Sequence, residues 1–174
     1  MKKLVVFIIS TFLLLMMPTS MASNTVIQLT APAYQNFTGE FRNDDLAQSL
    51  TPSGELGLKV YQPIAKNRTW VIDAALIDEV ILMSNQYALA TEAAPVGKEI
   101  AIAWLNQLKR VTASNEVIAL AYGNPDVALA KRLAPSDLRF YFVYGQDRLQ
   151  LALGRIVKSE PNVQWSVGKS GLSN

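Results

Sequence analysis

Two aspartates stand where short apolar segments change into helical sequence. Asp73 follows the apolar run 69–72, and Asp126 follows the run 117–122 after a short turn. In a parallel β/α fold the carboxyl ends of the strands meet at one rim, where such folds usually keep their chemistry. We therefore expect both aspartates on this rim as catalytic residues, one carboxylate acting as an acid and the other as a base or nucleophile on a glycosidic bond.

The same two aspartates also suit a structural role. Aspartate is a preferred residue at the start of a helix, where its side chain accepts hydrogen bonds from free backbone N–H groups and its charge favours the positive end of the helix dipole. Asp73 would cap a helix that begins at Ala74, and Asp126 would serve the helix that follows Asn124-Pro125. Both roles are compatible at a rim, so the alternative stays open.

Three further side chains are candidates for substrate binding. Tyr122 and Trp165 end predicted strands and offer aromatic faces on which a sugar ring can stack, although aromatic core residues look the same in sequence. Asn124 offers an amide on the same turn as Asp126, and it is also a good N-cap with Pro125 in the first helical position. Asp78, five residues after Asp73, is expected to face solvent.

Two missing residue types restrict the chemistry further. The chain contains no histidine and no cysteine. It therefore lacks the groups for a Ser-His-Asp or Cys-His site, a disulfide, or zinc coordination by nitrogen and sulfur. Carboxylates, hydroxyls and lysine remain, as does a hard metal bound by oxygen. We expect no cofactor and assign no metal ligands.

The elements that would position these groups alternate between strand and helix. Asn43 is the expected N-cap of the first helix, and Trp104 is expected in the core. The predicted strands are 25–30, 68–73, 117–122 and 163–167. The predicted helices are 43–50, 55–61, 74–84, 98–111, one beginning at 124–126, and one from 135–137 toward 157 that is interrupted at Gly145.

This alternation predicts an α/β fold with a parallel sheet of βα units. Strands separated by helices are joined by right-handed crossovers. Four units make about half of a β/α-barrel or a small open sheet. We favour the incomplete barrel, because the sequence stops just past the fourth predicted strand. On this interpretation either the chain is short for its kind or a protein partner covers the open edge of the sheet.

The first 22 residues have the pattern of a secretory signal peptide. Lys2 and Lys3 precede an uncharged apolar run, and small residues stand at Ser20 and Ala22. The run is shorter than the about 20 residues that a spanning helix needs, which argues against the alternative of an uncleaved anchor. We expect a secreted, extracytoplasmic protein with a single domain at 23–174, which contacts the membrane only during export.

Removing this segment also removes the net charge. The 16 basic residues become 14 without Lys2 and Lys3, and they face 14 acidic ones. A neutral mature chain does not predict nucleic-acid binding. Half of all residues are apolar, so a folded core is expected.

Several segments together resemble a family of large, uncharacterised secreted or membrane-anchored actinobacterial proteins. The segments are FRNDDLA (41–47), GEL (54–56), WVIDAALID (70–78), AWL (103–105) and YGNPDVAL (122–129). That family looks distantly similar to the β/α-barrel of some glycoside hydrolases and polysaccharide deacetylases. The resemblance implies a cell-envelope protein that binds or processes a polysaccharide, and a non-enzymatic envelope module that assembles with another protein is the alternative.

The chain also departs from this family. The family tends to read Asp-Pro-Asp where this chain has Asn124-Pro125-Asp126, so one possible carboxylate is an amide. Family members usually continue with more barrel and a membrane segment. Polysaccharide deacetylases resemble one another in a histidine-bound metal, which this chain cannot supply. These differences put catalytic activity in doubt.

Overall fold

The computed structural model describes residues 25–62 and 68–161, which form an α/β fold. The signal segment 1–22, the predicted strand 163–167 and Trp165 lie outside these residues. In chain order the described elements are β1 (Thr25–Leu29), α2 (Asp45–Leu50), α3 (Glu55–Tyr61), β2 (Arg68–Ile72), α4 (Ala74–Ser84), α5 (Lys98–Thr112), β3 (Glu116–Ala119), α6 (Val127–Leu133), α7 (Pro135–Leu153) and β4 (Lys158–Ser159).

The strands form one sheet in the order β1-β2-β3-β4, and all neighbours are parallel. One row across the sheet pairs Leu29 with Ile72, Ile72 with Ala119, and Ala119 with Ser159. Helices connect each strand to the next, because parallel neighbours need a crossover. The predicted parallel α/β sheet is therefore confirmed.

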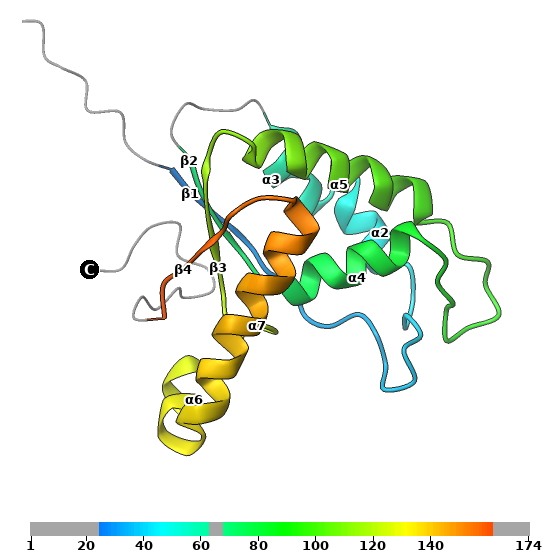
Figure 1. Cartoon of the computed structure of the whole chain (residues 1–174). Coiled ribbons are helices and arrows are strands. Elements are labelled where there is room, and N and C mark those ends of the chain that lie inside the picture. Colours follow the sequence, from blue (N-terminus) through cyan, green and yellow to red (C-terminus); the bar gives the residue numbers. More distant parts are fainter. Residues whose placement is uncertain (1–24, 63–67, 162–174) are drawn as a thin grey trace, which may run out of the picture.

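One face of the sheet packs against α2, α3, α4, α5 and α7 (Figure 1). This face and the helices share a single large apolar cluster, in which Trp70 and Trp104 are fully buried. The expectation that Trp104 belongs to the core is confirmed. α5 packs on this core with one apolar face. Its buried positions Ala101, Trp104, Leu108 and Val111 recur with helical spacing.

The opposite face carries a small apolar cluster of Val71, Ile118 and Leu120, with Val26 beside it. No helix of the described residues contributes to this cluster. At the amino end of the same face, the hydroxyl of Thr69 lies 3.2 Å from Glu116 Oε2, and Lys158 pairs with Glu116. The two faces therefore differ, since only one of them carries the main core.

Two predicted helix caps are wrong, one by one residue and the other by two. α2 begins at Asp45, and Asn43 precedes its N-cap residue Asp44. Asn43 Oδ1 accepts the N–H of Asp45, which forms a turn before the helix. Similarly, α6 begins at Val127 with Asp126 as its N-cap, so Asn124 is not the cap. In both places several consecutive polar residues could start the helix, and the local turn selects the later one.

The end of the chain also differs from expectation. α7 ends at Leu153, because Gly154 adopts a left-handed conformation with φ of 67°. β4 follows at Lys158–Ser159. Gly145 does not interrupt α7; a Cβ there would lie 2.5 Å from Leu120 O, so glycine lets the helix cross closely over the end of β3. Among the described helices, none has the length and hydropathy to cross a bilayer.

Candidate functional site

Asp73 lies at the carboxyl end of β2 and connects three elements. Its Oδ1 accepts the N–H of Ala75 at 2.9 Å, which caps α4, and the N–H of Gly123 at 3.0 Å, in the turn after β3. Its own N–H donates to Leu29 O at 3.0 Å, at the end of β1. The prediction that Asp73 starts a helix is confirmed, and the bond to Gly123 adds a role between strands.

Burial determines the electrostatics of this carboxyl group. Asp73 is 1 % exposed, and its burial raises its pKa above the ordinary value, while the N–H groups of Ala75 and Gly123 partly offset the shift and the charge of Asp78 adds to it. Within the described part of the chain, Oδ2 accepts no hydrogen bond. One oxygen is therefore used by the fold, and the other has little surface through which to meet a substrate.

Asp126 lies after the carboxyl end of β3, as Asp73 lies after that of β2, but its environment differs. It is exposed, and its Oδ1 accepts the N–H of Leu129 at 2.9 Å. It therefore caps α6, as the structural alternative predicts. α6 contains no buried residue and contacts α7. The two predicted catalytic carboxylates are thus one buried and one exposed helix cap, and their catalytic role stays a prediction.

The turn between β3 and α6 contains two consecutive left-handed residues, Gly123 with φ of 75° and Asn124 with φ of 43°. The N–H of Asn124 donates to Ala121 O at 2.8 Å, which closes the turn. Its half-buried side-chain amide makes no hydrogen bond to any described residue. Asn124 therefore has free donor and acceptor groups at the turn that Asp73 holds, as a substrate-binding residue would need.

Asp78 connects α4 to α7, through Arg148, and to the turn after β3, through Tyr122. The hydroxyl of Tyr122 donates to Asp78 Oδ2 at 3.0 Å, and Arg148 donates to both oxygens of Asp78, at 3.0 Å from Nε and 2.8 Å from Nη2. The side chain of Asp78 is only 14 % exposed, so the expectation that it faces solvent is wrong. The Arg148 guanidinium, far away in sequence, provides the reason for its burial.

This connection also uses the polar group of Tyr122. The ring of Tyr122 packs edge-on against Tyr144, with centroids 4.8 Å apart. Burial and the neighbouring charge of Asp78 raise the pKa of Tyr122 well above its ordinary value, so the phenol stays protonated. Binding of a sugar by its hydroxyl would compete with Asp78. Its role in substrate binding stays a prediction.

Glu79 is a buried polar group that the sequence interpretation missed. Its Oε1 accepts the N–H groups of Tyr34 at 2.9 Å and Gln35 at 3.1 Å, which hold the loop after β1 against α4. Burial raises its pKa, and those two N–H groups partly offset the shift. The available signal was its spacing, since Glu79 lies on the same helical face as Leu76 and Met83. Among the described residues, no group of three or more acidic side chains could hold a metal ion.

A different part of the surface exposes several large apolar side chains. We call the exposed side chains Phe140, Val143, Tyr144 and Leu151 of α7 its outer face. Phe140, Tyr144 and Leu151 recur with helical spacing, and the rings of Phe140 and Tyr144 stack with centroids 5.6 Å apart. Phe140 is 61 % and Leu151 76 % exposed. Aromatic and aliphatic side chains grouped in this way are typical of an interaction surface.

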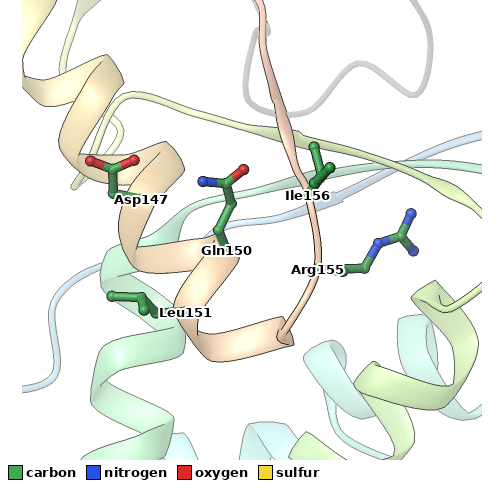
Figure 2. Close-up of a pocket in the computed structure, with 5 residues that line it drawn as sticks. All are labelled: Asp147, Gln150, Leu151, Arg155 and Ile156. Carbon is green, nitrogen blue, oxygen red and sulfur yellow. The ribbon is translucent and has the colours of Figure 1, made fainter.

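A hollow of about 580 Å³ continues this apolar surface at the carboxyl end of α7. Figure 2 shows it between α7 and the segment leading to β4, and its lining residues are Asp147, Gln150, Leu151, Arg155 and Ile156. Arg155 points away from α7 and donates to Thr112 O, which lies just before β3 begins. The hollow therefore lies near the amino ends of the strands, at the opposite end of the sheet from Asp73.

No known protein family, curated protein or solved structure matches this chain.

Proposed function

We propose that the protein is a secreted, non-enzymatic interaction module of the cell envelope, which binds another polypeptide through the outer face of α7 and the edge of β4. The observation that carries this proposal is the exposed apolar surface. Phe140, Leu151 and Ile156 are each more than half exposed, and Ile156 reaches 85 %. Burying such side chains against a partner is favourable by about 25 cal/mol per Å² of apolar surface.

We further propose that the sheet is part of a β/α-barrel. Its strands are parallel and in sequential order, and the helices that share its main core pack on one face. A doubly wound open sheet would carry helices on both faces, whereas a barrel carries them only outside. Among the described strands β4 is the outermost, and the outer backbone groups of such a strand can pair with a partner strand.

The carboxylates at the rim support a non-enzymatic role, because they already serve as helix caps. One oxygen of Asp73 already binds two backbone N–H groups, and the exposed Asp126 binds one. Export of the module is supported by the basic and apolar pattern of residues 1–22. Sequencing the amino terminus of protein recovered outside the cytoplasm tests export, and we expect it to begin at Ser23.

Photocrosslinking from α7 tests the interaction. We would replace Phe140 with photoreactive benzoylphenylalanine in the whole chain, produced in its native cells, and use the exposed Phe37 of the loop after β1 as the matched control position. We expect a defined crosslinked species from position 140 and none from position 37. The additional substitution Leu151→Asp should remove this species while circular dichroism stays unchanged. Equal crosslinking from both positions would contradict the proposal.

Glycan processing at the rim is the second candidate function. The observation that favours it is Asn124, which lies on a left-handed turn held by Asp73 and whose side-chain amide makes no hydrogen bond to a described residue. Residues held in such conformations are enriched at functional sites. Hydrolysis of envelope glycans by Asp73→Asn and Asp126→Asn proteins tests this function. Activity that survives both substitutions would exclude the carboxylate pair, and loss in both with unchanged folding would support it.

A further inference from the structure

We propose that the polypeptide bound by the outer face of α7 is an amphipathic helix, and that this helix places a lysine or arginine side chain in the hollow at the carboxyl end of α7. This inference rests on the proposed interaction function and names the chemistry of the partner. It is carried by the spacing of the exposed residues of α7, the carboxylate of Asp147 among them, and the walls of the hollow.

Four exposed residues of α7 form a row along the helix, which we call the seam. They are Phe140, Tyr144, Asp147 and Leu151, separated by four, three and four positions. Residues three and four apart lie on the same side of a helix, so the row is about 16 Å long. Rows with this spacing pack against another helix whose apolar residues recur in the same way. A partner helix of about three turns therefore covers the seam.

Asp147 places a carboxylate within the seam. Among the described residues it forms no hydrogen bond and no ion pair, and the residues three and four positions before and after it are uncharged. Its neighbour Arg148 binds both oxygens of Asp78 on α4. Covering a carboxylate with an apolar partner is costly unless an opposite charge accompanies it. The partner helix therefore carries a basic side chain opposite Asp147.

The basic residue that lines the hollow is already used by the fold. Arg155 points away from α7 and donates to the carbonyl oxygen of Thr112, the last residue of α5 (Figure 2). Its positive charge therefore lies at the negative end of the α5 dipole. This leaves the carboxylate of Asp147 to a ligand. The carboxyl end of α7 borders the hollow and adds to its preference for a positive group.

The walls of the hollow suit the long stem of a basic side chain. Leu151 and Ile156 are both exposed and line the hollow with Gln150. Figure 2 shows Asp147 and Leu151 on α7, with Ile156 on the segment that leads to β4. Lysine and arginine bury their methylene stems on apolar surface and keep the charged end in a polar environment. A stem that lies on Leu151 and Ile156 brings its charge to Asp147.

The wall opposite α7 is fixed within the folded chain. Gln146 Nε2 donates to Val157 O at 2.7 Å, and Gln150 Oε1 accepts the N–H of Val157 at 3.2 Å. Both backbone polar groups of Val157 are thus bound to α7, and its side chain belongs to the main core. These contacts hold the neighbouring Ile156 in place. A site that is already ordered loses less conformational entropy when it binds a partner.

A membrane surface suits the seam less well than a helix does. Helices that lie on membranes carry lysine and arginine beside their apolar face and are attracted to anionic lipids. α7 instead carries Asp147 within the seam, and an anionic surface would repel this carboxylate.

Two synthetic peptides that differ in one residue provide the test. Each is an amphipathic helix of about three heptads with leucine at the a and d positions, except that the central a position is lysine in one and glutamate in the other. We would titrate a low concentration of each fluorescent peptide with the whole chain and measure anisotropy. We expect the lysine peptide to bind about tenfold more tightly or better, because glutamate would face Asp147 with a like charge.

Reversing the charge on the protein sharpens this result. In the Asp147→Lys protein the preference should invert, so that the glutamate peptide binds more tightly. Glu92→Lys makes the same change of charge at an exposed position of the loop before α5, and it should leave the preference for lysine unchanged. A preference that Asp147→Lys does not alter would overturn the proposed pairing. Failure of both peptides to bind would overturn it as well.

Other occupants of the seam would give different results. If the lysine peptide binds only a chain that ends at residue 161, then residues 162–174 of this chain occupy the seam. Twice the mass of one chain in light scattering, reduced to one chain by Leu151→Asp, would identify a second copy. Binding of the unsubstituted chain to phosphatidylglycerol vesicles, abolished by Leu151→Asp, would identify a membrane. Each of these results would overturn the partner helix.

Photocrosslinking from position 140 separates this inference from the proposed function. The crosslinked species should decrease about tenfold when Asp147→Lys is added, and Glu92→Lys should not change it. A species that Asp147→Lys leaves unchanged would overturn the basic side chain and leave the proposed function standing. The absence of any crosslinked species would overturn both.

Discussion

Asp73 and Leu151 belong to two regions of the molecule in which the usual relation between polarity and burial is reversed. At the carboxyl ends of the strands, Asp73 is 1 % exposed and one of its oxygens already accepts two backbone N–H groups. On the outer face of α7, Leu151 is 76 % exposed and borders a hollow. The polar group is held inside the fold, and the apolar one faces solvent. At the rim the carboxyl group already serves the fold, whereas on α7 the apolar side chain has no such role within the described residues.

This difference shows how far residue type alone can mislead. Carboxylates at strand ends suggest chemistry, but helix starts and strand ends require the same groups to satisfy backbone N–H donors. An apolar helix suggests a core, but α7 buries only one side. Its buried positions are Leu138, Phe142, Gly145 and Leu149. Substitutions in the two regions should therefore have different effects, the largest of them in the buried side of α7.

Two leucines on α7 should separate folding from association. Leu149 is fully buried, and Leu151, two residues further along the helix, is exposed. Leu149→Ala should lower the free energy of unfolding by about 2–5 kcal/mol, since it removes core contacts and leaves a cavity. Leu151→Ala should change it by less than about 0.5 kcal/mol. Urea denaturation at low protein concentration measures both free energies. A similar loss in the two variants would contradict the statement that the outer face does not contribute to the folded core.

The two predicted catalytic aspartates should differ as helix caps. Asp73→Ala should cost about 2–3 kcal/mol of unfolding free energy, because it removes a cap and leaves the N–H of Gly123 without its acceptor. Asp126→Ala should cost about 0.5–1 kcal/mol, as an exposed cap does. Urea titration of each variant provides the measurement. Equal costs would show that the bond to Gly123 adds no stability.

Gly145 tests the close crossing of α7 over β3. Gly145→Ala should destabilise the fold by about 1–3 kcal/mol, because the new methyl group would lie 2.5 Å from Leu120 O. The better helix propensity of alanine offsets part of this cost. Asp147→Ala, on the exposed side of the same helix, is the matched control and should stay within about 0.5 kcal/mol. Thermal unfolding that ranks the two variants in the opposite order would rule out the crossing.

Asp73 and Glu116 should give opposite dependences on pH. Burial raises the pKa of Asp73 above 3.8 in the folded state, so its contribution to stability is complete below the unfolded pKa and is lost as pH rises through the folded pKa. The hydrogen bond from Lys158 lowers the pKa of Glu116 below 4.5. Its contribution is therefore present above the unfolded pKa and is lost as pH falls through the folded pKa.

Urea unfolding from about pH 3 to pH 7 measures this contrast. Relative to the unsubstituted protein, Asp73→Asn should gain stability as pH rises, and Glu116→Gln should lose it. Asn retains an oxygen that can accept the N–H groups of Ala75 and Gly123, so the capping geometry is kept. A constant difference between Asp73→Asn and the unsubstituted protein across this range would mean that burial of the carboxyl group does not alter its titration.

Much of the fold could be predicted from local patterns. The patterns predicted strands at 68–73 and 117–122 and a helix at 98–111, which correspond to β2 (Arg68–Ile72), β3 (Glu116–Ala119) and α5 (Lys98–Thr112), and their alternation indicated the parallel sheet. The capping role of Asp73 was also predictable, because a helix start needs an acceptor next to it in sequence. Boundaries were less accurate at Asn43 and Asn124, where several neighbouring residues satisfy the same rule.

Contacts between distant residues were not predictable. The sequence predicted that Asp78 faces solvent, but Arg148, 70 positions away, pairs with it in the folded protein. Glu79 was missed for a similar reason, since its partners Tyr34 and Gln35 come from the loop after β1. The spacing of Glu79 signals its burial but not its partners, because a charged residue taken alone is equally suited to solvent.

By itself, the sequence determined the type and order of the elements and excluded histidine and cysteine chemistry, since propensity, capping and composition are local properties. Only the tertiary structure decided that Asp73 is buried as a junction while the outer face of α7 is left exposed. The physical reason is that burial depends on which surfaces meet in space. The same amphipathic pattern can face a core or a partner, and only the packing of α7 on α4, α6, β3 and β4 selected the side that is exposed.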